Sequence, residues 1–316
     1  MADPLTGVRV LDLSVWRPGP YCTQLLAGLG AHVRKIEPPN GDPMRAFPEL
    51  FASLNARKES RRVDLKTDAG RDEALDLAAE VDVVVEGFRP GVVARLGVAY
   101  EDVKARNPSV VYCSISGFGQ TGPLAQAPGH DLTYMAWAGA LSPDGAPPVA
   151  PRIPVADLAA ATAAAMQICA ACVRRAATGE GAFLDIAMAD VCAGWTGEAD
   201  SKLFGQTRAT REIPGYGTFP TADAGWIALG VLDEDHFWSG LCQALGLDAH
   251  ADLEFAARAA RVTELQAAVT EAVARRRRDE LVTELLAAGV PVAPVLDRPG
   301  MLELEHFRAR GVFSGP

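Results

Sequence analysis

The sequence is short of basic residues. Thirty Lys and Arg stand against forty Asp and Glu, which gives the 316 residues a formal net charge of −10. A protein that binds nucleic acid usually carries a basic face, so we expect no nucleic-acid partner, although a local basic pocket for an anion remains compatible with this charge. No uninterrupted apolar run is as long as a membrane span, and the N-terminus MADPLTGVRVLDLS lacks a basic segment followed by an apolar one. We therefore expect a cytoplasmic protein with no membrane partner.

Several other signatures are also missing. The six cysteines are scattered, and Cys169 and Cys172 form a CxxC without a second pair. We interpret them as buried thiols in a reducing compartment, with metal or redox use as the less favoured alternative, so no metal site is predicted. The glycines do not spell GxGxxG, and no repeat of fixed period is present. No nucleotide-binding site can be inferred from such a fingerprint.

The first half of the chain alternates short apolar runs with amphipathic segments. This order of strands and helices predicts α/β units that build a parallel, Rossmann-like sheet. Residues 39–51 are expected to be a loop. Strands are predicted at residues 7–13, 33–37, 81–86, 110–116 and 182–188. Helices are predicted at residues 21–29, 70–79 and 100–106, and a long one starts at Asp157.

A smaller α/β module begins near residue 214. The segment PGYGTFPTADAGWIALGVL predicts an antiparallel hairpin that turns at residues 223–225, and helices are expected to follow it. The resulting division has a large domain, a linker, a small domain and a C-terminal segment that returns toward the large domain. These are predicted at residues 1–190, 191–213, 214–298 and 299–316.

Three places offer acid–base or nucleophilic chemistry. Asp157 opens a long Ala-rich helix after a Pro/Gly-rich loop, and the alternative role for such an aspartate is that of a helix cap. His130 precedes Asp131 at another predicted helix start, and a neutral imidazole can abstract a proton near pH 7. Asp233 and Glu234 also precede a helix, where the alternative role is to stabilise the helix dipole.

Cationic residues mark candidate anion sites. The segment 57–66 has the densest positive charge in the first half, and we favour a solvated turn over a phosphate site there. Arg89 and Arg95 follow the strand predicted at 81–86. Parallel sheets usually bind ligands at the carboxyl ends of their strands, so these two arginines are the better candidates.

Many segments of the chain, taken in order, resemble the family III CoA-transferases. The resemblance runs from residue 4 to about 245. It implies a Rossmann-like large domain, a smaller α/β domain and an interlocked homodimer, whose active site lies between the large domain of one chain and the small domain of the other. The matching segments include PLTGVRVLDLS, VDVVVEGFRPGVVARLG, NPSVVYCSISGFGQTGP, PGHDLTYMAWAGAL and PVADLAA.

The resemblance also implies roles for individual residues. Asp157 falls on the catalytic aspartate of the family, and the GHD motif places His130 on the histidine of its α-methylacyl-CoA racemase branch. The third racemase acid falls on Glu234 or, in an alternative alignment, on Asp233. No permanently bound cofactor is implied, because coenzyme A enters as part of an acyl-CoA thioester. Its implied contacts are Arg17, Pro18, Arg57, Lys58, Phe88 and Arg95, and the position of Arg89 after a strand adds it to this set.

Our main functional prediction is an acyl-CoA racemase or epimerase. It would invert the 2-methyl carbon through an enolate, with His130 on one face of the carbon and Asp157 on the other. The alternative is a CoA-transferase that moves CoA between carboxylic acids through an aspartyl-acyl anhydride at Asp157. A third hypothesis is a noncatalytic relative that keeps only the fold.

Overall fold

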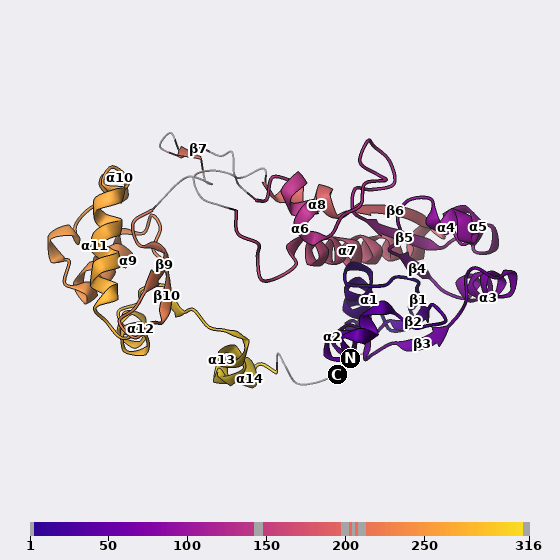
Figure 1. Cartoon of the computed structure of the whole chain (residues 1–316), viewed down its shortest axis with the longest axis horizontal. Helices are drawn as coiled ribbons and strands as arrows, with labels where there is room; N and C mark the ends of the chain where they lie inside the picture. The colour runs from indigo at the N-terminus through magenta and orange to yellow at the C-terminus, as the bar shows by residue number, and fades with distance from the viewer. Residues whose placement is uncertain (1–2, 142–147, 197–201, 204–205, 208–212, 312–316) are drawn as a thin grey trace. The chain divides into compact units, whose positions relative to one another are not determined.

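The computed structural model describes residues 3–141, 148–196, 202–203, 206–207 and 213–311 (Figure 1). The chain divides into two compact units, of which the first is Met1–Ala209 with Pro316 and the second is Thr210–Gly315. Two core clusters lie in the first unit and one in the second.

The first unit is built on a six-stranded parallel sheet. Its strand order is β3-β2-β1-β4-β5-β6, and each neighbouring pair is parallel. The chain reverses its direction of growth between β1 and β4, which is where sheets of this type bind ligands. The predicted α/β class and Rossmann-like sheet are therefore confirmed. The strands are β1 (Arg9–Asp12), β2 (His32–Glu37), β3 (Glu59–Arg62), β4 (Val83–Glu86), β5 (Val111–Ser116) and β6 (Ala182–Ala187).

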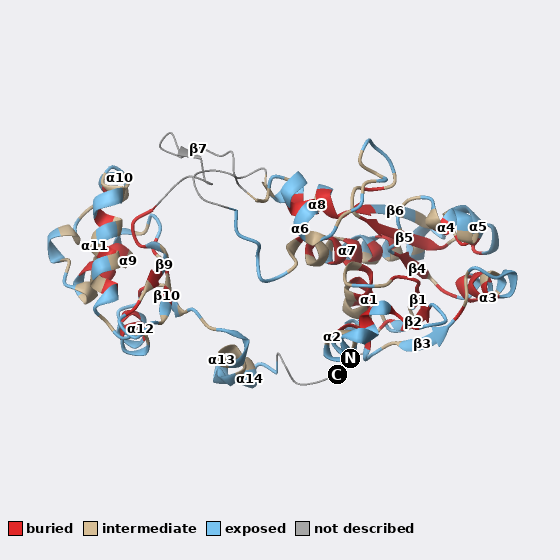
Figure 2. Cartoon of the chain, in the orientation of Figure 1, coloured by how far each residue is buried: buried red, intermediate tan, exposed pale blue. Residues whose placement is uncertain are grey.

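Helices cover both faces of this sheet, as Figure 2 shows by the buried strands between exposed outer surfaces. Val10 and Val83 pack against one set of helices, and their neighbours Leu11 and Val84 pack against the other. Every residue of β4 and β5 is buried, as expected for parallel strands covered on two sides. One face carries α1 (Pro18–Gly28), α6 (Asp131–Trp137), α7 (Val155–Thr178) and α8 (Met188–Thr196). The other carries α3 (Asp68–Ala79), α4 (Val92–Leu96) and α5 (Tyr100–Arg106).

Helix α7 lies at the centre of this arrangement. Its buried face consists mainly of alanines, whose small side chains let α1 and the sheet approach closely. Gly179 ends the helix with a φ of +76°, a conformation that glycine adopts without strain. By length and composition α7 could also span a membrane, although polar residues interrupt its apolar run, and 44% of its most apolar window is buried inside the unit.

The structure departs from the sequence-based prediction between residues 43 and 62. Helix α2 (Pro48–Asn55) overlaps the expected loop, after a short 3-10 helix (Pro43–Ala46) that Asp42 caps by accepting the Met44 N–H at 2.8 Å. Strand β3 occupies part of the expected solvated turn. All four of its side chains are exposed, so it shows no apolar alternation, and its position depends on backbone pairing with β2.

The second unit has a three-stranded antiparallel sheet in the order β11-β10-β9. The predicted hairpin is present, and Phe219, Ile227 and Trp238 are fully buried between its sheet and helices. The elements are β9 (Tyr216–Pro220), β10 (Trp226–Gly230), α9 (Asp235–Leu245), α10 (Phe255–Ala259), α11 (Val262–Ala274), α12 (Arg278–Ala287), β11 (Val292–Pro294), α13 (Arg298–Glu303) and α14 (Glu305–Ala309).

The segment expected to be a linker begins inside a helix. Residues 191–196 belong to α8, which packs on α6 and α7 of the first unit. Beyond them the structure places β7 (Lys202–Leu203) and β8 (Gln206–Thr207), which pair in an antiparallel manner. The rest of the predicted linker up to residue 212 lies outside the described residues, so its predicted boundaries stay predictions.

Candidate functional site

Asp157 lies in the first turn of α7 and does not act as its cap. The N-cap position is Pro154, and no side chain makes a capping hydrogen bond there. Instead, the backbone N–H of Asp157 donates to Oδ1 of Asp131 at 3.1 Å, across 26 residues of sequence. The two helix starts that the sequence placed at His130 and Asp157 are therefore held together.

The Asp157 carboxyl lies in an environment that disfavours its charge. Burial raises its pKa from 3.8 to about 6, and the negative charge of Asp131 adds to the increase. Arg17, whose Nε is 4.0 Å from Oδ2 of Asp157, opposes both effects. The side chain is still 17% exposed, so a ligand can reach it. A partly desolvated carboxylate that is ionised at neutral pH is a better nucleophile or base than a fully hydrated one.

Tyr134 forms one wall of this region. It is buried in α6, and its ring packs edge-on against Phe118 at a centroid distance of 5.2 Å. Burial raises the pKa of its phenol, the charge of Asp157 raises it further, and Arg89 lowers it. The side chains of Tyr134, Asp157 and Arg89 are thus close enough to interact electrostatically. Sequence reasoning missed Tyr134, and its position one helical turn after His130 was the available signal.

Two glycines make room for the Tyr134 ring. A Cβ atom at Gly129 would lie 2.4 Å from Cε1 of Tyr134, and a Cβ at Gly117 would lie 2.5 Å from the same atom. Neither glycine has a positive φ, so both are required for space and not for backbone conformation. The glycine of the GHD motif therefore lets the ring pack at the start of α6.

His130 is exposed at the N-cap of α6. Its backbone N–H donates to Oγ1 of Thr133 at 2.9 Å, which fixes the start of the helix. His130 thus directly precedes Asp131, whose carboxylate accepts the Asp157 N–H. The structure places these residues on adjacent helix starts and gives His130 access to solvent.

The acids Asp233 and Glu234 belong to the second unit. Glu234 is the N-cap of α9, and its Oε2 accepts the Leu232 N–H at 3.3 Å. The fully buried Arg258 holds the same loop by donating to the Leu232 and Asp233 carbonyls and to Asp235. The assignment of either acid to catalysis stays a prediction.

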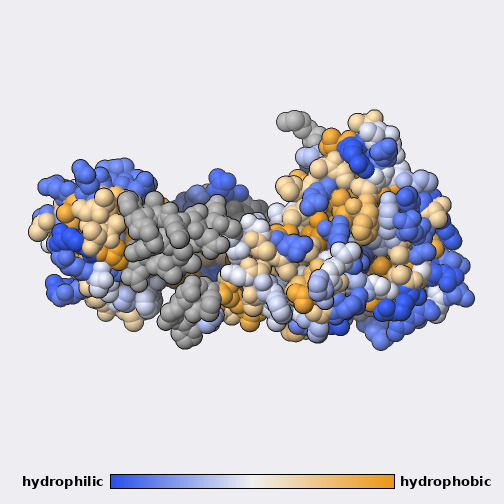
Figure 3. All heavy atoms as spheres, turned by 90° about the horizontal axis from the view of Figure 1, so that it is seen from above, coloured by the Kyte–Doolittle hydropathy of each residue, from blue (hydrophilic) through white to orange (hydrophobic). Residues whose placement is uncertain are grey.

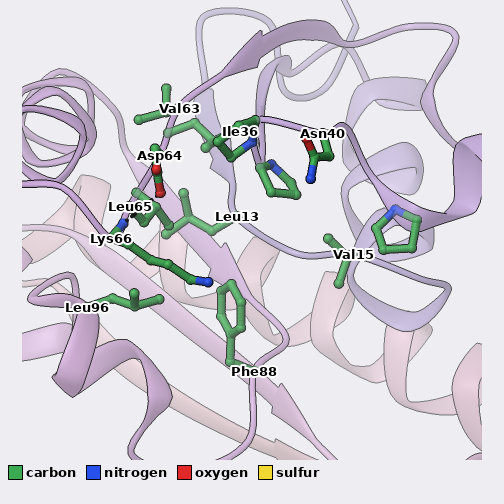
Figure 4. A pocket seen from close by; sticks show the side chains of 13 residues that line it. Leu13, Val15, Ile36, Asn40, Val63, Asp64, Leu65, Lys66, Phe88 and Leu96 are labelled. Carbon is green, nitrogen blue, oxygen red and sulfur yellow. Dashed lines mark hydrogen bonds between the residues drawn. The ribbon is translucent and has the colours of Figure 1, made fainter.

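A cavity of about 540 Å³ opens at the carboxyl ends of β1 to β4 (Figure 4). Apolar side chains dominate its lining, with Asn40, Asp64 and Lys66 as the polar exceptions. In the close-up the Lys66 side chain extends toward the Phe88 ring. Its size and its mainly apolar wall with few polar groups are typical of a small-molecule site. Phe88 is the one residue of the predicted CoA set that lines it.

The remaining predicted CoA contacts have different surroundings. Arg57, Arg89 and Arg95 are exposed, and Arg95 lies on α4 directly after the Phe88 turn. Pro18 is the first residue of α1, and Arg17 precedes it beside Asp157. These positions leave the four arginines partly or fully accessible to an anionic ligand.

Lys58 differs from these arginines because its ammonium is enclosed. The side chain is only 1% exposed and donates to Asp12 at 3.1 Å, to the Pro20 carbonyl at 2.8 Å and to Asn55 at 2.9 Å. An ammonium has three donors, and all of them are used. The predicted contact between Lys58 and CoA would need a donor that this geometry does not provide.

Known proteins match this chain over nearly its whole length. The model of CoA-transferase family III matches residues 5–315. An acetyl-CoA:oxalate CoA-transferase of Acetobacter aceti is 32% identical over 98% of this chain and 85% of its own length. A succinate–glutarate CoA-transferase of Agrobacterium fabrum is 32% identical over 98% and 84%. The crystal structure of a CAIB/BAIF family protein from Brucella suis matches with a TM-score of 0.85 and 31% identity over 98% and 89%. The chain is therefore an enzyme that belongs to CoA-transferase family III.

Proposed function

We propose that the protein is a CoA-transferase that moves CoA between two carboxylic acids through an acyl anhydride at Asp157. The observation that carries this proposal is the half-buried Asp157 carboxyl, ionised at neutral pH and still accessible beside Arg17. The relatives named above are CoA-transferases, which supports this alternative over the racemase that was our main prediction.

The reaction needs one carboxylate nucleophile and no proton transfer. An oxygen of Asp157 attacks the thioester carbonyl of the donor, the C–S bond breaks, and an anhydride and CoA thiolate form. The thiolate attacks the aspartyl carbonyl and releases the donor acid as its carboxylate. The acceptor carboxylate then displaces the thiolate to form a second anhydride. Finally the thiolate attacks the acceptor acyl carbon, which yields the new acyl-CoA and frees Asp157.

The surroundings of Asp157 fit the charges that develop in these steps. Each attack creates a tetrahedral oxyanion next to the first turn of α7, where the helix dipole is positive. Arg17 lies beside Asp157 and can pair with an incoming or departing carboxylate. Asp131 holds the Asp157 backbone but disfavours its charge, which keeps the carboxylate reactive.

We further propose that the cavity lined by Phe88 receives the nucleotide part of CoA. Its apolar wall suits an adenine ring, and Lys66 in the lining offers a cation for the phosphates. Arg89 and Arg95, on the turn and helix that follow β4, are the exposed arginines near the same strand end. The acyl end of the substrate would then lie toward Asp157.

We also propose that the active protein is a homodimer. Helices α6, α7 and α8 pack on one another and carry large apolar side chains that are exposed to solvent in the single chain. We call this set the apolar helix face. Figure 3 shows hydrophobic residues exposed among hydrophilic ones on one side of the first unit. Its members are Trp137, Met166, Val173 and Trp195, which are 67%, 66%, 72% and 63% exposed. Such a surface on a folded unit is typical of an interface.

Isotope transfer from an acceptor acid tests the transferase proposal. Acceptor carboxylate labelled with ¹⁸O should pass one ¹⁸O atom to Asp157 in each turnover, which mass spectrometry of the peptide can detect. Asp157→Asn should lower transfer by at least about a thousandfold. The matched control is Asp190→Asn, an exposed acid in the first turn of α8, which should leave transfer unchanged.

A second measurement separates the transferase from the racemase. A 2-methylacyl-CoA in deuterated water, with no acceptor acid, should take up no deuterium at its α-carbon if the proposal is right. Deuterium uptake that depends on His130 would instead support the racemase, because only that reaction needs a second proton-transfer group. Transfer that survives in Asp157→Asn would also overturn the proposal.

A further inference from the structure

Glu86 is a buried acid that the proposed transfer does not use. It is the last residue of β4, and only 1% of it is exposed. Its Oε2 accepts the backbone N–H of Phe88 at 2.7 Å. The carboxyl therefore holds the start of the turn from Gly87 to Gly91, which places the Phe88 ring in the cavity wall.

The same carboxyl is connected to the neighbouring strands. Glu86, Ser114 and Asp185 lie in one row across β4, β5 and β6. The Ser114 hydroxyl bonds the Glu86 carboxyl and accepts from Nε2 of Gln120 at 2.7 Å. The backbone N–H of Gln120 donates in turn to Asp185 at 3.0 Å. Glu86 thus connects the Phe88 turn to the glycine-rich loop after β5.

Glu86 differs from the acid that ends strand β2. Glu37 is also buried, but Arg45 donates two bonds of 2.6 Å to it, and these, with the bonds from Ser60 and the Asp42 N–H, outweigh burial and lower its pKa to about 2. Among the residues that the structure describes, no lysine or arginine forms an ion pair with Glu86. A purely structural acid is normally paired as Glu37 is, because an unpaired buried charge destabilises the fold.

We propose that Glu86 is a positioning residue for the binding of the nucleotide part of CoA. As a carboxylate, Glu86 holds the Phe88 turn against the cavity, and on protonation it releases this turn. This inference rests on the proposed CoA-binding role of the cavity. A carboxylate accepts strong, charge-assisted hydrogen bonds from both Phe88 and Ser114. Once protonated, the group gains one O–H donor and its bonds lose their charge assistance, so its hold on the Phe88 N–H weakens.

The groups around Glu86 place its protonation near neutral pH. Burial raises the pKa of Glu86 from 4.5 to about 7, the bonds from Ser114 and Phe88 oppose the increase, and the charge of Asp185 adds to it. The other titratable groups that face Glu86 are Tyr112 and Cys113 of β5, whose own pKa values its charge helps to raise. No cation faces it among these groups, so the carboxyl is free to titrate in the range where the enzyme would operate.

The test compares CoA binding by the wild type and Glu86→Gln between pH 5.5 and 8.5, using calorimetry on the full chain. Glutamine has the size of a protonated glutamate and does not titrate. Both proteins share the titration of the 3′-phosphate of CoA, so the ratio of their dissociation constants isolates Glu86. We expect this ratio to be near one at pH 5.5 and to rise to roughly fivefold at pH 8.5, the equivalent of one lost hydrogen bond.

A second variant protects the test against a folding defect. Asp185→Asn removes the one neighbouring charge that raises the pKa of Glu86, so its pH midpoint for CoA binding should move to lower pH. A ratio that stays constant over the whole range, or an unmoved midpoint in Asp185→Asn, would overturn the inference. Failure of the wild type to bind CoA at any pH would instead overturn the proposed function.

Discussion

In the proposed transfer, the protonation state of Asp157 decides when the enzyme can act. A nucleophilic carboxylate must be ionised, and its pKa is raised to about 6 by burial and by Asp131. We therefore expect kcat/KM for the acyl-CoA donor to fall as the pH drops below about 6. Asp131→Asn removes the repulsion but keeps an oxygen that can accept the Asp157 N–H. The acid limb of its pH–rate profile should move to lower pH.

A variant with the opposite expected effect serves as the control for the direction of the pH shift. Arg17→Gln removes the charge that lowers the pKa of Asp157, so the acid limb should move to higher pH. Stopped-flow assays of the first CoA release, recorded across the pH range, measure both variants. Shifts in the same direction for the two variants would show that the limb does not report Asp157.

At the residue scale, the sequence indicated candidate residues but not the residues that they contact. Asp157 and His130 were identified because their motifs stand next to helix starts. The bond between Asp131 and the Asp157 backbone joins residues 26 positions apart, and local pattern contains no information about it. Lys58 is the opposite case: this cation of a basic stretch pairs with Asp12 at the end of β1, far from it in the sequence.

The start of helix α6 depends on the space that glycine leaves. Gly129→Ala would place a Cβ 2.4 Å from the buried Tyr134 ring and 2.7 Å from Thr133. Overpacking of this kind typically costs about 1–3 kcal/mol, which exceeds the smaller entropic gain of a Gly→Ala change. Urea denaturation should therefore show a lower free energy of unfolding. Activity should fall as well, because Tyr134 lies close enough to Asp157 for the charge of Asp157 to raise the pKa of its phenol.

The matched control lies on the neighbouring helix. A Cβ at Gly194 of α8 would meet no atom within 4 Å. Replacing a helical glycine by alanine there should raise the free energy of unfolding by about 0.5–1 kcal/mol. Equal effects of the two substitutions would contradict the steric explanation for Gly129.

Strands with buried faces were predictable, and the exposed edge strand was not. Strands such as β4 and β5 appear as continuous apolar runs because both of their faces are covered. Strand β3 has the sequence ESRR, all exposed, and exists because the edge of β2 offers hydrogen-bonding groups. Its pairing is a tertiary effect, which a window of sequence does not contain.

At the scale of the whole molecule, the net charge of −10 affects the attraction of CoA, and the apolar helix face affects self-association. A negative chain repels a CoA molecule at long range, so local cations must provide the attraction near the cavity. Lys66, Arg89 and Arg95 are the exposed cations suited to that role. We attribute the apolar helix face to the proposed contact with a second copy.

Self-association of this kind can be measured directly. Light scattering should give about twice the chain mass of 33.3 kDa. Met166 and Val173 are seven residues apart on α7 and therefore lie on the same side of the helix. The double variant Met166→Glu/Val173→Glu should shift the protein toward the monomer, because it places two like charges in the contact.

The control charge change must lie on the other face of the sheet. Lys104→Glu is suitable because Lys104 is exposed on α5, and it should leave the mass unchanged. A monomeric wild type, or dissociation by both variants alike, would contradict the assignment of this face to the dimer contact. Transfer activity that falls together with dimer content would indicate in addition that the second copy completes the site. An active monomer would show that one chain holds every group that the transfer needs.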